Sequence, residues 1–160
     1  MKKPKTMTPA EQRVAIAKDA LAWIEAGALK PMPGVFVSPV NVTESLSPTG
    51  QLRDAVLGPC EVCAIGAMFI AKAVRFDEVT TDQYRCGQFH EPLRRHFDAK
   101  QLALIETAFE GQVYVWNEDA RLSDAEKWAA HGFYAAHVGA SSRLTAILRN
   151  IIANDGTFIP

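Results

Sequence analysis

The sequence has few cysteines, no excess of charge of either sign and no long hydrophobic run. Its three cysteines are few, and an odd number of them cannot all pair, which argues against a disulfide framework. We therefore expect free thiols in a reducing compartment. With a net charge of −1, the chain lacks the positive field of a general nucleic-acid-binding protein. The longest apolar run, residues 62–71, is roughly half the ~20 residues that a membrane-spanning helix needs. We therefore expect a cytoplasmic protein without a membrane segment.

The common catalytic signatures are also missing. The sequence contains no Gly-x-Ser-x-Gly, no phosphate-binding loop, no dinucleotide-binding fingerprint and no His-Glu-x-x-His. These absences favour a non-enzymatic function.

What the sequence does contain is a series of helix signals in a chain of ordinary globular composition, 48% hydrophobic and 22% charged. Thr8-Pro9-Ala10-Glu11 and Ser123-Asp124-Ala125-Glu126 both read as helix-starting capping boxes, and Asp98 with Gln101 predicts a third. Residues 144–152 carry apolar side chains at helical spacing, and Phe158 and Ile159 behind them are placed to fold back onto the body.

The most apolar segment predicts the centre of the fold. Residues 59–75 are apolar on every side up to Lys72, as expected for a buried helix. We predict a mainly α protein, a compact bundle of about five to seven helices around this central helix (59–75), with at most short β segments. The expected domain is 1–160, with 1–7 flexible. The irregular segment 28–50 fits either a packed loop or a functional one.

The cysteines carry three alternative interpretations. Cys60 and Cys63, at the expected start of the central helix, have the spacing of a redox pair whose thiolate a helix N-terminus would stabilise. With Cys86 and His90 they would form a Cys3His zinc site, the one cofactor that we consider. The interpretation that we favour is that both are small core residues, because free cysteine is commonly buried.

Two further groups of residues are candidates for binding. One basic cluster would receive a phosphate or an acidic partner, although a solvated helix face explains it equally; it comprises Arg85, Arg94, Arg95, His96 and Lys100. Aromatic residues gather between 116 and 134, and an exposed Trp or Tyr among them would indicate a protein interface.

Three stretches resemble segments of small uncharacterised helical proteins of phages and prophages. They are the Cys-x-x-Gly-Ala type opening at 59–67, residues 101–110, and the Asn-Ile-Ile-x-Asn-x-Gly-x-Phe-x-Pro tail at 150–160. The resemblance implies a small mobile-element protein and transfers no functional residue. We expect a binding protein that acts on a host protein, for example as an inhibitor of host defence, or on a small anionic ligand. A homodimer is compatible with the apolar final helix.

Overall fold

The computed structural model describes residues 6–39, 60–76, 90–113 and 118–160, and it confirms the mainly α class. Six α-helices lie in the described part of the chain, within the expected number. In chain order the elements are α1 (Pro9–Glu25), β1 (Leu29–Pro31), β2 (Val37–Pro39), β3 (Cys60–Val62), α3 (Ala64–Phe76), α4 (His90–Leu93), α5 (Ala99–Glu110), the 3-10 turn η2 (Glu118–Ala120), α6 (Asp124–Ala136) and α7 (Ala140–Ala153). None of these helices is both long and apolar enough to cross a membrane.

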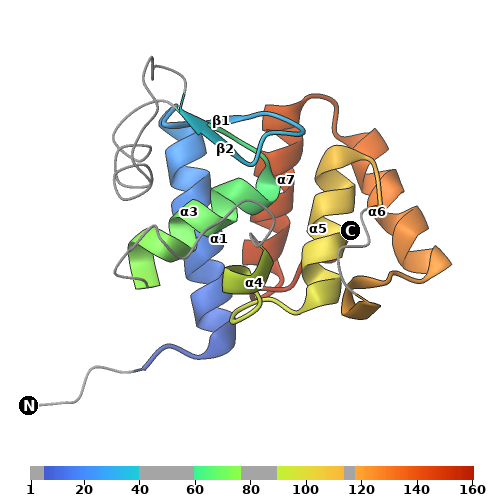
Figure 1. Ribbon diagram of the computed structural model, residues 1–160, viewed down its shortest axis with the longest axis horizontal. Helices are drawn as coiled ribbons and strands as arrows, with labels where there is room; N and C mark the ends of the chain where they lie inside the picture. Colours follow the sequence, from blue (N-terminus) through green and yellow to red (C-terminus); the bar gives the residue numbers. More distant parts are fainter. Residues whose placement is uncertain (1–5, 40–59, 77–89, 114–117) are drawn as a thin grey trace, which may run out of the picture.

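The helices form a packed body with one helix at its edge. The long helices α1 and α7 lie side by side, α3 packs across α1, and α5 packs on both α3 and α7 (Figure 1). Helix α6 packs against α5 on the side away from α1. It is therefore the outermost helix at this edge.

The start of the central segment differs from the prediction. We expected the helix to begin at Pro59, which lies outside the described residues, but Cys60–Val62 is a strand and the helix begins at Ala64. β3 lies between β1, to which it is parallel, and β2, to which it is antiparallel, with Glu61 opposite both Lys30 and Ser38. A short apolar run bordering a helix cannot be distinguished from a buried strand by periodicity, which explains the error.

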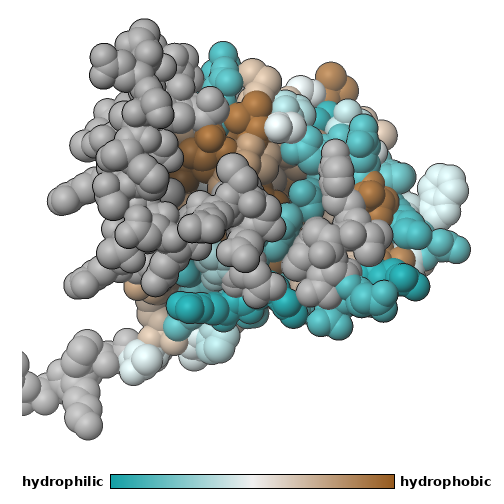
Figure 2. All heavy atoms as spheres, in the orientation of Figure 1, coloured by the Kyte–Doolittle hydropathy of each residue, from teal (hydrophilic) through white to brown (hydrophobic). Residues whose placement is uncertain are grey.

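The rest of the central segment is as buried as expected. All ten residues from Ala64 to Ala73 are buried, including the side chain of Lys72. Gly66 lies so close to the loop before β2 that a Cβ atom there would overlap the carbonyl oxygen of Phe36. Phe36 and Phe69 then pack ring to ring, with centroids 5.5 Å apart. Strands and helices thus meet around α3, and hydrophobic side chains gather over the strands in the space-filling view (Figure 2).

Two of the three predicted capping boxes form completely. Thr8 and Ser123 each accept the N–H of the glutamate three residues later, and Glu11 and Glu126 accept the N–H of the capping residue in return. At α5 only half of the box forms, because the Asp98 carboxylate accepts the N–H of Gln101 at 2.8 Å but the Gln101 side chain turns elsewhere.

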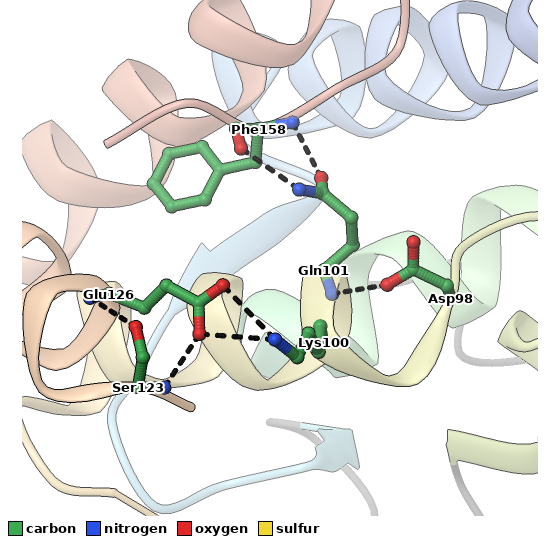
Figure 3. Close-up of polar contacts among 6 residues, drawn as sticks. All are labelled: Asp98, Lys100, Gln101, Ser123, Glu126 and Phe158. Carbon is green, nitrogen blue, oxygen red and sulfur yellow. Dashed lines mark hydrogen bonds and ion pairs between the residues drawn. The ribbon is translucent and has the colours of Figure 1, made fainter. Parts of the chain in front are cut away.

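Gln101 instead holds the end of the chain against α5. Its amide nitrogen donates to the carbonyl of Phe158 at 3.0 Å, and its amide oxygen accepts the N–H of Phe158 at 2.7 Å (Figure 3). Asn150 makes the same double contact with the backbone of Ile159, at 2.7 and 2.9 Å. Phe158 folds back and is buried as predicted, whereas the side chain of Ile159 is exposed.

Two further helix ends are set by short local features. α4 is only four residues long and is followed by a turn. α6 ends at Ala136, and α7 begins at Ala140. Gly139, at φ 91°, caps α7 without contributing a side chain.

Candidate functional site

The cysteine pair spans the junction between β3 and α3. Cys60 is completely buried in the central strand, and its thiol donates to the carbonyl of Glu61 at 3.7 Å. The Cys63 sulfur accepts the N–H of Gly66 at 3.4 Å. Burial nevertheless raises the pKa of the Cys63 thiol to about 12, so that this hydrogen bond does not produce a thiolate at neutral pH. A protonated thiol is a poor nucleophile, and this argues against the redox interpretation.

The zinc interpretation depends on a residue outside the described ranges. Cys86 is not described, and His90 pairs instead with Glu106, its Nε2 lying 3.1 Å from the carboxylate. Within residues 6–39, 60–76, 90–113 and 118–160, no three His, Cys, Asp or Glu side chains come together as a group that could hold a metal. The site of Cys60, Cys63, Cys86 and His90 therefore stays a prediction.

Sequence reasoning missed a partly buried acidic pair on α5. Glu106 and Glu110 are one helical turn apart, and Glu110 accepts the N–H of Gly34 at 2.9 Å. Burial raises the pKa of Glu110, and the charge of Glu106 adds to this, while the bond from Gly34 and the charge of Arg143 oppose it. The spacing of four was readable in the sequence, but the approach of Gly34 from 76 positions away was not.

The described members of the basic cluster, Arg94, Arg95, His96 and Lys100, do not form one anion-binding surface. Arg85 lies outside the described residues, and Arg95 is exposed on the turn after α4. Arg94 and Lys100 do line one shallow hollow of about 450 Å³, but Asp98 and Asp119 line it too. Arg94 lies 3.4 Å from the Asp119 carboxylate and Lys100 lies 3.3 Å from that of Glu126 (Figure 3). These acids offset the positive field that a phosphate would need.

His96 has a role in packing instead. Its Nδ1 lies 3.0 Å from the amide oxygen of Gln12, and its ring stacks on Phe76 with centroids 5.2 Å apart. Arg13 donates to the His96 carbonyl at 3.2 Å. The histidine thus joins the turn after α4 to α1 and α3.

The most unusual surface of the described structure lies on α6. Only one of its 13 residues, Ala130, is buried. The side chain of Trp128 is 77% exposed, although tryptophan is one of the residues that proteins bury most on average. Several exposed small residues recur at spacings of three and four and share one face with Trp128, while the exposed residues Asp124, His131 and Tyr134 lie outside it. We call this surface the Trp128 face; it comprises Ala125, Trp128, Ala129, Gly132, Ala135 and Ala136.

This surface carries no formal charge beyond its first turn. Residues 128–142, from α6 into the first turn of α7, include no Asp, Glu, Lys or Arg, although charged residues make up 22% of the chain. This segment contains two histidines, His131, which is exposed, and His137, which is partly buried. In the space-filling view, one large pale side chain projects at the right-hand edge, in the region of α6, among mostly hydrophilic neighbours (Figure 2). Solvated helix faces usually carry charges of both signs, so this face departs from that pattern.

Other side chains attach α6 to the body. Phe133 packs edge-on against Phe158 with centroids 5.1 Å apart, and stacks on His137 at 4.2 Å. The Arg143 guanidinium lies 3.7 Å from the centre of the Tyr134 ring and donates to the carbonyls of Phe109 and His137, both at 3.1 Å. The helix is therefore positioned without Trp128. Of the aromatic residues considered from the sequence, Trp128 is highly exposed, Tyr134 is at the margin, and Trp116 is outside the described residues.

No family model, curated protein or solved structure matches the chain.

Proposed function

We propose that this protein is a non-enzymatic protein-binding module and that the Trp128 face is its recognition surface. The observation that carries this proposal is the 77% exposure of Trp128 on a helical face of small, uncharged residues. Tryptophan is enriched among the residues that dominate binding energy, and charged residues are depleted from interface cores.

The physical chemistry of the face supports binding to a protein rather than to a small ion. A buried tryptophan contributes roughly 150–250 Å² of contact area, with few rotamers to immobilise. Helix α6 is already formed and fixed by its contacts with α5, α7 and the C-terminal tail, so that binding requires little ordering. The small anionic ligand considered from the sequence has less support, because Arg94 and Lys100 already have carboxylate partners.

The origin of the protein and its biological target belong to the same proposal. The resemblance of residues 59–67, 101–110 and 150–160 to phage and prophage proteins implies a host protein as the heterologous partner, as for an inhibitor of host defence.

The test compares two substitutions of exposed apolar residues by aspartate. Trp128→Asp places a charge at the centre of the face, and Val74→Asp places one on α3, where Val74 is 48% exposed. We expect the wild-type protein and Val74→Asp each to capture one partner protein from a host lysate in stoichiometric amount. Trp128→Asp should bind that partner at least tenfold more weakly. Equal capture by all three proteins would contradict the proposal.

A further inference from the structure

The Trp128 face is complementary to itself, and on this basis we propose that it binds a second copy of the same chain. In this dimer two α6 helices pack antiparallel about a two-fold axis at Gly132. The inference rests on the proposed function, because it names the partner of the same face.

The positions along α6 provide the geometry. Ala125 and Gly132 are seven residues apart, as are Ala129 and Ala136, so that small side chains follow one line along the helix. Small residues along such a line let two helix backbones approach closely. In an antiparallel pair centred on Gly132, a residue that precedes Gly132 by some number of positions faces the residue of the second copy that follows Gly132 by the same number. Trp128 then faces Ala136 of the second copy, and Ala129 faces Ala135.

The sizes of these residues make the two copies fit each other. The face has one large side chain, Trp128, and it has small residues at the positions that Trp128 would meet in the partner. Each tryptophan therefore covers the partner's Ala136, and the two indoles lie on opposite sides of the axis without colliding. Such an isologous contact closes on itself and gives a dimer rather than a filament.

Charge favours the antiparallel orientation. The formal charges of α6 all lie in its first turn, where Glu126 pairs with Lys100, and Asp124 lies 3.8 Å from Lys127 with its side chain 94% exposed. A parallel pair would bring the two exposed Asp124 carboxylates together. The antiparallel pair instead brings Asp124 of one copy beside the junction of α6 and α7 in the other.

That junction is suited to a nearby carboxylate. The N-cap of α7 is Gly139, which makes no side-chain hydrogen bond to the helix, and the first-turn residues Ser141 and Ser142 are exposed. The positive end of the α7 dipole is thus left without an acidic neighbour of its own in the first turn. The acids nearest in sequence before this junction, Glu126 and Asp124, lie in the first turn of α6, at its opposite end. Glu110 at the end of α5 interacts electrostatically with Arg143, which lies one turn into α7.

The area available sets the strength of the dimer. Two Trp128 side chains would bury roughly 300–500 Å² between them, and the alanine surfaces that they cover add a similar amount. The total, roughly 600–1,000 Å², lies below the lower limit of stable specific interfaces, about 1,200 Å². We therefore expect a weak dimer whose mass depends on concentration rather than a permanent one.

The test uses the residue that faces itself. A Cβ atom added at Gly132 meets no atom within 4 Å, so we expect charged substitutions there to leave the monomer fold intact. Gly132→Glu and Gly132→Lys each place two like charges at the two-fold axis, whereas a mixture of the two variants places opposite charges there. Sedimentation equilibrium from low-micromolar to near-millimolar protein measures the mass, and Val74→Glu is the control for a charge placed elsewhere.

We expect wild type and Val74→Glu to dimerise with the same dissociation constant. Each Gly132 variant alone should dimerise at least tenfold more weakly, and an equimolar mixture of the two should form the heterodimer. Dimerisation that neither Gly132 variant weakens, or a mixture that forms no heterodimer, would overturn the two-fold pairing at Gly132.

A monomeric wild type has two distinguishable meanings. If it captures another protein in a manner that Trp128→Asp abolishes, the second copy is the wrong partner and the protein-binding function stands. If it captures none, both the dimer and the proposed function are wrong.

Discussion

Helices α3 and α6 have the same length, 13 residues, but opposite relations to the rest of the molecule. Ten residues of α3 are buried, against one of α6. Both helices are rich in alanine, and their alanines have different consequences. In α3 they let strands and helices approach closely, whereas in α6 they leave a smooth surface around Trp128. Composition alone therefore does not show whether a helix is structural or available for binding.

The two helices also differ in how the fold specifies them. Nearly every side chain of α3 is constrained by a neighbour, so its sequence is accounted for by packing. α6 is held by its capping box, by Phe133 and Tyr134, and by Arg143 from α7, which leaves one face unconstrained by the fold. Packing within the monomer does not explain why the Trp128 face is free of charged residues. Binding of this face to another protein does explain it.

The largest expected effect compares a large aromatic residue from each helix. Phe69→Ala removes a completely buried ring that packs on Phe36, and we expect it to lower the free energy of unfolding by about 3–5 kcal/mol. Trp128→Ala removes an even larger aromatic group, but one that is 77% exposed, and the change should stay within about 0.5 kcal/mol. Urea denaturation at a low protein concentration, where the monomer predominates, measures both. A loss of several kcal/mol for Trp128→Ala would show that the face contributes to the monomer fold.

A second comparison applies the same substitution to a glycine in each helix. The Cβ atom of Gly66→Ala would overlap the Phe36 carbonyl, and we expect overpacking to cost about 1–3 kcal/mol or more. Gly132→Ala meets no neighbouring atom, and replacing an exposed helical glycine should stabilise the monomer by about 0.5–1 kcal/mol. Opposite signs in thermal or urea unfolding would confirm the contrast. Destabilisation by both substitutions would show that the α6 surface is more constrained than its exposure indicates.

The sequence specified the helix starts well because capping is local. Thr8, Asp98 and Ser123 each bind an N–H three residues later, and such a pattern is visible within four letters. The prediction allowed short β segments but not their pairing, because β3 pairs with strands that begin 31 and 23 positions earlier, at Leu29 and Val37, and no local signal marks such pairing.

The candidate site was only partly predictable for the same reason. The sequence identified Trp128 and Tyr134 as residues whose exposure would be informative, but it could not show which face of α6 is turned away from α5. The basic residues were grouped by closeness in sequence. The turn after α4 separates them, sending His96 to Gln12 on α1 and leaving Arg94 beside Asp119.

The smallest expected effect concerns two glutamates with opposite environments. Burial raises the pKa of Glu110 near the α3 side, whereas the N–H of Ser123 and the ammonium of Lys100 lower that of Glu126 at the start of α6. A raised carboxyl pKa means that the folded state binds the proton more tightly. The contribution of Glu110 is therefore complete at acidic pH and is lost as the pH rises through its folded pKa. The contribution of Glu126 has the opposite sign, being present at neutral pH and lost as the pH falls through its lowered pKa.

Two glutamine variants separate these contributions. Relative to wild type, Glu110→Gln should become more stable as the pH rises from about 3 to 7, because it removes the buried charge and keeps an oxygen for Gly34. Over the same range Glu126→Gln should become less stable, because it removes the charge that accepts from Ser123 and Lys100. Urea midpoints at each pH measure the two differences. Slopes of the same sign would mean that the two glutamates share one environment, and the electrostatic contrast between the buried side of the molecule and the α6 edge would then be wrong.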